Sequence, residues 1–66
     1  MDMDREQELW AAANMLMNRH GEDAWFHAAQ RADELGAQGD LRGQSTYIAI
    51  LRRIEQLTGE ITGSLN

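Results

Sequence analysis

Residues 40–58, DLRGQSTYIAILRRIEQLT, carry the most regular pattern in the chain and decide its fold. Asp40 is a favoured N-cap residue, and apolar positions follow it at alternating spacings of four and three. These positions form a seam of the a/d type and are Gly43, Tyr47, Ile50, Ile54 and Leu57. A glycine inside a helix costs about 1 kcal/mol relative to alanine, so Gly43 predicts that another backbone approaches closely there. The segment therefore predicts a helix with one buried face.

The residues before Gly21 predict a first helix over about 4–20. Asp2 or Asp4 can act as its N-cap, and Gly21 follows as the left-handed residue that ends the helix. At about 100° per residue, one face gathers Leu9, Ala12, Ala13, Leu16, Met17 and His20, with Trp10 at its margin. Met15 points to a different side of this helix, where we expect it to be exposed.

A second helix is expected over about 22–35. It opens at Glu22 or Asp23 and ends at Leu35, before the glycine-bearing stretch GAQGD. Its apolar face is mostly alanine and comprises Ala24, Trp25, Ala28, Ala29, Ala32 and Leu35. Small side chains on this face let a neighbouring helix come close.

The chain is therefore expected to be all-α, with three short helices over about 4–20, 22–35 and 40–58 forming a small helical bundle. The alternative arrangement is a helical hairpin followed by a long helix. Residues 1–58 form a single helical domain in this interpretation, and residues 59–66 form a frayed tail. Ile61 and Leu65 continue the four-residue spacing past Leu57, so the last helix would run on if a partner covered them.

Length and charge limit what the chain can do. It has 66 residues, no cysteine and a net charge of −5. A domain of this size buries only about 60% of the surface that its unfolded chain exposes, so we expect a thin core. Six basic against eleven acidic residues is the wrong balance for direct nucleic-acid binding. The sequence has no apolar run near the roughly 20 residues of a membrane span and an acidic N-terminus, so we expect a cytoplasmic protein without membrane contact.

The two histidines are the first candidates for a chemical site. His20 ends the first helix, where an imidazolium interacts well with the negative helix end, and His27 falls on a polar face beside Arg31 and Glu34. A metal site would need both histidines and a carboxylate such as Asp23 to converge across the turn, a spacing that matches no familiar ligand pattern. We expect structural roles instead, with His20 directed inward, His27 directed outward, and no metal or other cofactor.

Several side chains are candidates for contact with a partner, namely Phe26, Ile48, Met15, Arg52 and Arg53. The arginines of the third helix form either a solvated face or a docking patch for an acidic partner. Trp10 and Trp25 are expected in the core, with an exposed binding role as the alternative. The full set of expected structural anchors is Trp10, Leu16, His20, Gly21, Trp25, Asp40, Gly43, Tyr47, Ile50, Ile54 and Leu57.

The order ELWAAA, RHG, RADEL and GDLRG, followed by an aromatic residue and IAILRRIEQL, resembles a family of short uncharacterised proteins from alphaproteobacteria, classed as a domain of unknown function. The resemblance spans about Glu8 to Leu57, and its most specific pieces are RHG at residues 19–21 and GD at residues 39–40 with Gly43. The matching positions are His20, Gly21, Asp40, Gly43 and Tyr47. The resemblance implies a bacterial cytosolic origin and no particular activity.

Three functions are compatible with these observations. The favoured one is a small helical interaction module, a homodimer, that binds protein through faces bearing Phe26, Ile48 and the third-helix arginines. The alternative is an acidic inhibitor of phage or defence origin that mimics nucleic acid and blocks a basic groove of its target, as the segment MDMDREQE suggests. The third is a metal protein or enzyme that uses His20 and His27. Because the serines have no neighbouring base by spacing, we do not expect an enzyme.

Overall fold

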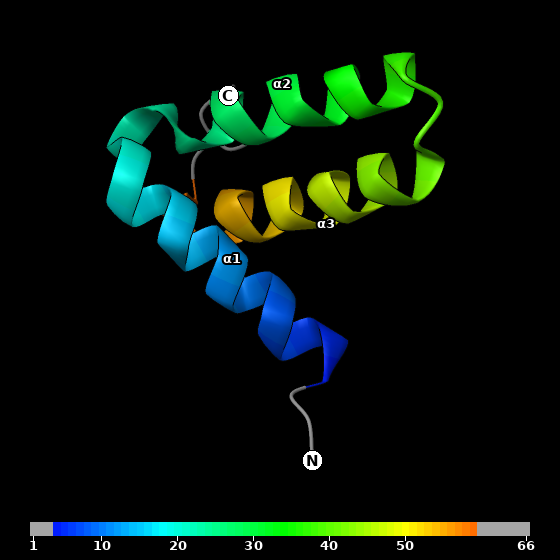
Figure 1. The fold of residues 1–66 in the computed structure, drawn as a ribbon. Coiled ribbons are helices and arrows are strands. Elements are labelled where there is room, and N and C mark those ends of the chain that lie inside the picture. The colour runs from blue at the N-terminus through cyan, green and yellow to red at the C-terminus, as the bar shows by residue number, and fades with distance from the viewer. Residues whose placement is uncertain (1–3, 60–66) are drawn as a thin grey trace.

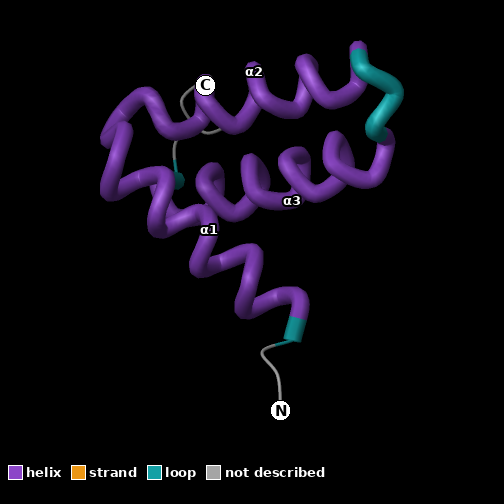
Figure 2. Tube along the Cα trace, viewed as in Figure 1, coloured by secondary structure: helices purple, strands orange, loops and turns teal. Residues whose placement is uncertain are grey.

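A computed structural model describes residues 4–59, and these are helical almost throughout (Figure 1). Helix α1 spans Arg5–His20, the 3-10 turn η1 covers Gly21–Asp23, α2 spans Ala24–Ala37 and α3 spans Leu41–Thr58. No strand occurs within residues 4–59, and the connections between helices are short (Figure 2). The chain is all-α with three helices, as predicted. Asp2, Ile61, Leu65 and residues 60–66 of the expected tail lie outside the described residues.

Helix α1 begins where an aspartate caps it and ends at a glycine. The Asp4 carboxylate accepts a 2.9 Å hydrogen bond from the Gln7 amide, so Asp4 is the N-cap. At the other end, the Gly21 amide donates to the carbonyl of Met17. Gly21 has a φ of +58°, as its position predicts, but a ψ of −125°, which lies outside the left-handed helical region. The chain therefore turns at Gly21 and continues directly into η1.

The second helix begins later than Glu22 or Asp23, where the sequence places its start. Residues 21–23 form the 3-10 turn, and the Asp23 side chain makes no capping hydrogen bond. The 3-10 turn leads directly into α2, so this helix needs no capping side chain of the Ser, Thr or Asp type. Its first residue is accordingly Ala24.

The second helix also ends later than Leu35. It passes through Gly36 and ends at Ala37. The chain turns at Gly39, whose φ of +85° lets the Asp40 amide donate a 2.9 Å hydrogen bond to the Leu35 carbonyl. A glycine ends a helix where it takes a positive φ, and Gly36 keeps the helical geometry instead. The prediction that α2 ends before Gly36, the first glycine of GAQGD, is therefore wrong.

Helix α3 begins at the predicted cap. The Asp40 carboxylate accepts a 2.9 Å hydrogen bond from the Gly43 amide. A Cβ atom at position 43 would lie 2.6 Å from that same carboxylate, so the residue is small because of the cap beside it. The prediction that another helix approaches closely at Gly43 is wrong. The tight contact between helices lies at Gly36, where the side chain of Gln44 from α3 occupies the space that a Cβ would take.

Helices α2 and α3 lie side by side and run in opposite directions, and α1 crosses this hairpin obliquely (Figure 1). The contact between α2 and α3 is the most extensive, followed by that between α1 and α3. All three helices contribute to one core cluster, formed by Leu9, Ala13, Ala24, Ala28, Ile50 and Ile54. Toward its N-terminus α1 diverges from the hairpin. The molecule is thus a helical hairpin with a third helix docked across one end.

The core is as thin as the chain length predicts. Four of the eight buried hydrophobic residues are alanines, and Ile54 is the one large side chain within residues 4–59 that is fully buried. Leu16, Met17 and Tyr47 are half-buried against this cluster. Leu57, expected to be an anchor of the seam, is 41% exposed. The buried face of α3 ends at Ile54, so the last turn carries Leu57 beyond the cover of the other helices.

Candidate interaction surfaces

Among the large hydrophobic side chains of residues 4–59, five are exposed, four are buried and six are half-buried. The exposed ones are Met15 at 54%, Phe26 at 66%, Leu41 at 69%, Ile48 at 40% and Leu57 at 41%. The buried ones larger than alanine are Leu9, Leu35, Ile50 and Ile54. Within residues 4–59 more large hydrophobic side chains therefore face solvent than are buried. The exposed ones come from all three helices.

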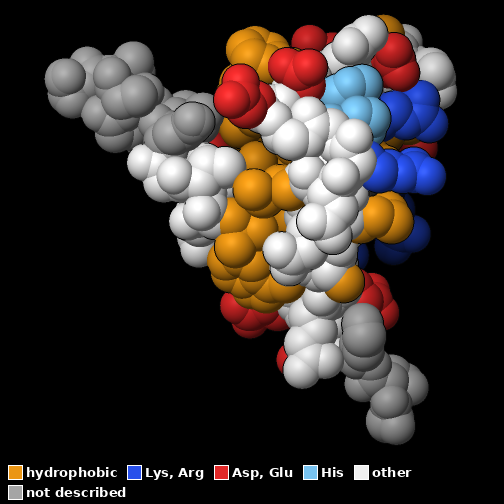
Figure 3. Space-filling model, turned by 90° about the vertical axis from the view of Figure 1, so that its left-hand side faces the viewer, with side chains coloured by type: hydrophobic (Ala, Val, Ile, Leu, Met, Phe, Trp, Pro, Cys, Tyr) orange, Lys and Arg blue, Asp and Glu red, His pale blue; other side chains and the backbone are white. Residues whose placement is uncertain are grey.

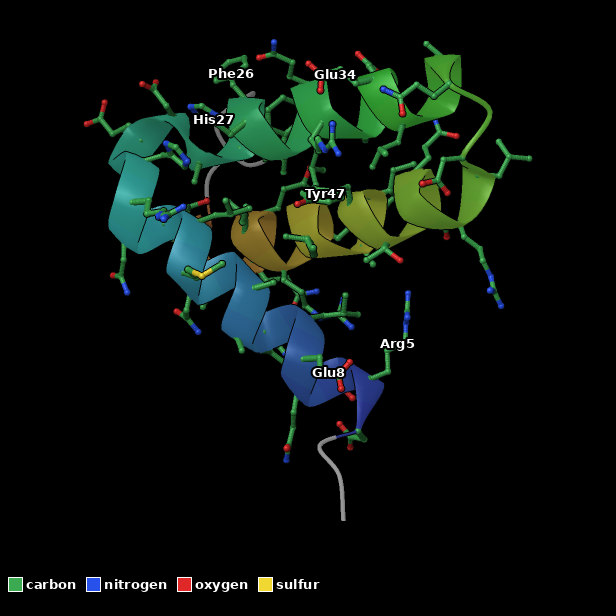
Figure 4. The ribbon with its side chains drawn as sticks, viewed as in Figure 1. Arg5, Glu8, Phe26, His27, Glu34 and Tyr47 are labelled. Carbon is green, nitrogen blue, oxygen red and sulfur yellow. The ribbon has the colours of Figure 1, made fainter. Side chains whose placement is uncertain are left out.

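Phe26 lies on the outer side of α2, away from α3 (Figure 4). Its ring meets that of Trp25 edge-on, with ring centroids 5.3 Å apart and planes at 83°. This contact covers part of one edge and leaves 66% of the residue exposed. The structure thus places Phe26 on the surface, where the helical periodicity predicted it.

A second exposed apolar group lies on α3. Leu41 and Ile48 are seven residues apart, which puts them on the same side of the helix, and the exposed Arg52 follows Ile48 by one turn. Ile48 and Arg52 were predicted as partner contacts from the sequence. Leu41, which directly follows the N-cap, was not predicted to be exposed. The signal that could have found Leu41 is its seven-residue spacing to Ile48.

Arg53, expected on the same basic side as Arg52, is used within the chain. Its guanidinium carbon lies 5.3 Å from the ring centroid of Trp10, in a cation–π contact that joins α3 to α1. The Arg53 Nε atom is buried and has no hydrogen-bond partner among residues 4–59. Arg53 therefore covers Trp10, and its predicted contact with a partner stays a prediction. Trp10 itself is half-buried under this side chain rather than a member of the central cluster.

Trp25 anchors α2 to α3 through its polar atom as well as its ring. The indole N–H donates a 2.9 Å hydrogen bond to Glu55 Oε2, and both residues are half-buried. The ring packs against the core cluster, as predicted. Sequence patterning missed Glu55, because no local rule brings residues 25 and 55 together.

The side chains of the two histidines lie against each other. The rings of His20 and His27 are stacked, with centroids 3.6 Å apart and planes at 20°. His20 is half-buried and His27 is exposed, in keeping with the expectation that the first points inward and the second outward. The sequence did not predict that the 3-10 turn brings the two rings together. No group of three or more His, Asp or Glu side chains within residues 4–59 could hold a metal ion.

The polar face of α2 is an ordinary solvated surface at its other end. Arg31 and Glu34 form an ion pair of 3.1 Å between side chains that are each 48% exposed. An exposed pair of this kind contributes little to stability. The predicted cluster of His27, Arg31 and Glu34 is thus reduced to the last two, since His27 stacks on His20.

A polar cleft opens between the start of α1 and the first turns of α3. Its lining side chains are Arg5, Arg42, Ser45 and Thr46. Arg5 Nη2 donates a 3.1 Å hydrogen bond to Thr46 Oγ1 and so bridges the gap where the two helices diverge. Sequence patterning does not reveal this cleft, because Arg5 is far in the chain from the three lining residues of α3.

Side chains separate by type on the side of the molecule where α1 turns into α2 (Figure 3). Hydrophobic side chains gather in a band down the middle of this face, with the histidines and then arginines to one side of it. This face therefore offers apolar surface and positive charge together.

The fold and its surfaces define a small all-α protein with exposed hydrophobic side chains and one polar cleft within residues 4–59. The chain belongs to a family described as a family of unknown function (DUF6961), which it matches over residues 5–62. The match runs past Leu57, where the resemblance seen in the sequence was expected to end. No curated protein and no solved structure shows significant similarity to the chain. None of the helices within residues 4–59 has both the length and the apolar composition needed to cross a membrane.

Proposed function

We propose that this chain is a small helical protein–protein interaction module that associates with a second copy of itself. The observation that carries the proposal is that five large hydrophobic side chains are exposed while four are buried among residues 4–59. Fully burying one such side chain contributes about 1.5–3 kcal/mol. Association would therefore supply stability that the core of a short chain cannot. The role proposed is binding rather than catalysis, in the bacterial cytoplasm that the sequence resemblance favours.

In this proposal Phe26 is the central contact of one surface, and Ile48 with Leu41 forms the other. Large aromatic side chains dominate the energy of many protein interfaces. Arg52 lies one turn from Ile48 and forms no ion pair within residues 4–59. Because the chain has a net charge of −5, a second copy offers many carboxylates as partners for Arg52.

Sedimentation equilibrium tests the proposal directly. The wild-type chain of 7.5 kDa should approach twice that mass at high micromolar concentration, and Phe26→Gln should shift the population toward the monomer. Ala37→Gln is the matched control, since it introduces the same side chain at an exposed position of α2 without removing a ring. A wild-type chain that stays strictly monomeric at high micromolar concentration would rule the proposal out.

Disulfide cross-linking then locates the contact, because the chain has no cysteine of its own. In a two-fold symmetric dimer, only residues near the axis lie close to their own copies. Gln30→Cys reports on the surface around Phe26, and Ser45→Cys reports on the surface around Ile48. Rapid cross-linking of one variant and not the other assigns the axis to α2 or to α3.

A further inference from the structure

The cleft lined by Arg5, Arg42, Ser45 and Thr46 has a composition unlike that of the whole chain. The sequence contains eleven acidic residues against six basic ones, yet among residues 4–59 no carboxylate lines this cleft. All four lining side chains can donate hydrogen bonds, and two of them are permanently cationic. Its volume of about 570 Å³ falls in the range of small-molecule sites.

Arg5 is directed into the cleft by a specific contact. Glu8 lies one turn further along α1, at the spacing of a common helical ion pair. Arg5 instead points toward α3, away from Glu8, and donates to Thr46 Oγ1 at 3.1 Å (Figure 4). Since the Thr46 oxygen accepts this bond, its hydroxyl proton is available for another acceptor.

Two carboxylates that lie near these arginines in sequence serve as helix caps. Asp4 accepts from the Gln7 amide at the start of α1, and Asp40 accepts from the Gly43 amide at the start of α3. Within residues 4–59 neither Arg5 nor Arg42 forms an ion pair. Two arginines and two hydroxyl-bearing residues therefore line one cleft, and no carboxylate of residues 4–59 forms an ion pair with them.

We propose that this cleft binds the phosphoryl group of a small phosphorylated molecule. A phosphoryl group carries close to two negative charges and three acceptor oxygens, which suits two guanidinium groups and two hydroxyls better than a planar carboxylate does. Arg5 and Arg42 approach the group from α1 and α3, and Ser45 and Thr46 donate from α3. Binding at this point would also close the divergent end of the molecule by tying the start of α1 to α3.

A titration followed by two-dimensional ¹H–¹⁵N NMR tests the site, with inorganic phosphate as the probe and sodium chloride at matched ionic strength as the reference. Phosphate should shift the amide signals of residues 5, 42, 45 and 46 saturably, and chloride should not. Arg42→Gln and Ser45→Ala should weaken binding, the arginine change by roughly tenfold. Arg19→Gln is the matched control, because it removes the same charge from an exposed helical position outside the cleft.

Several results would overturn the proposal. Shifts that do not saturate, shifts equal to those with chloride, or equal weakening by Arg42→Gln and Arg19→Gln would show a general charge effect. Repeating the titration with glycerol phosphate identifies the source of the group. Tighter binding of the ester shows that its organic part is also recognised, and equal binding shows that the phosphoryl group alone is. Far-UV circular dichroism of each variant verifies that the helices remain.

Discussion

At the residue scale, the start of α3 depends on the carboxylate of Asp40 and on the missing side chain of Gly43. The carboxylate satisfies an amide that has no partner within the helix, and it sits in the space that a Cβ at position 43 would need. The two residues therefore act as a unit. Glycine at position 43 is unfavourable for the helix itself, and it is required only as long as the cap is present.

This coupling predicts a reversal of sign in a double-mutant cycle. Gly43→Ala should lower the free energy of unfolding in the wild type, because the new methyl group displaces the Asp40 carboxylate. Asp40→Ala alone should cost about 1 kcal/mol through loss of the cap. In the Asp40→Ala background, Gly43→Ala should raise stability by up to about 1 kcal/mol through its helix propensity. Urea denaturation of the four proteins measures the cycle, and additive effects of the two substitutions would contradict it.

At the scale of the elements, the corner between α1 and α2 depends on Gly21. Its φ of +58° with a ψ of −125° is a conformation that L-residues rarely adopt, and no atom lies within 4 Å of where a Cβ would stand. Any effect of a side chain at this position therefore arises from the backbone and not from a clash. The corner in turn determines how the stacked histidines meet and where α2 is directed.

The handedness of this conformation gives a second prediction. Gly21→Ala should destabilise the protein by about 1–3 kcal/mol, the cost of holding an L-residue in such a conformation. D-alanine at position 21, introduced by chemical synthesis, has the mirror-image preference and should be neutral or stabilising by up to about 1 kcal/mol. Thermal unfolding of the three proteins compares them. Equal destabilisation by both forms of alanine would show that steric crowding, and not φ, requires the glycine.

The sequence predicted the elements well where the reason was local. The cap at Asp40, the positive φ of Gly21 and the exposure of Phe26 and Ile48 follow from capping chemistry and the 3.6-residue period. The end of α2 was predicted wrongly because Gly36 and Gly39 are equally suited by sequence to end a helix. Which glycine turns depends on the hydrogen bonds that the hairpin makes around it.

The contacts that sequence patterning missed all join different elements. Glu55 with Trp25, Arg53 with Trp10, and Arg5 with Thr46 each depend on how the helices cross, and a helical wheel contains no such information. The histidine stack was missed for a related reason. The wheel treats α1 and α2 separately, while the 3-10 turn between them determines how the two rings meet.

At the scale of the whole molecule, the division of large side chains between core and surface predicts that stability depends on protein concentration. If folding and association are linked, raising the concentration tenfold should raise the midpoint of thermal unfolding by a few degrees. Circular dichroism in cells of different path length measures this over two orders of magnitude of concentration. Phe26→Gln should reduce the dependence, and a midpoint that is constant for the wild type would indicate that the monomer is stable alone.

The arrangement of the helices also bears on how the chain acquires its structure. The most extensive contact joins α2 to α3, which follow each other in the chain across a turn of three residues. Contacts between segments so near in sequence need little loop closure, and helical domains rich in them fold within microseconds to milliseconds. We therefore expect the hairpin to form first during folding and α1 to dock on it afterwards. Because α1 comes first in the chain, its apolar face emerges from the ribosome before the hairpin that covers it exists.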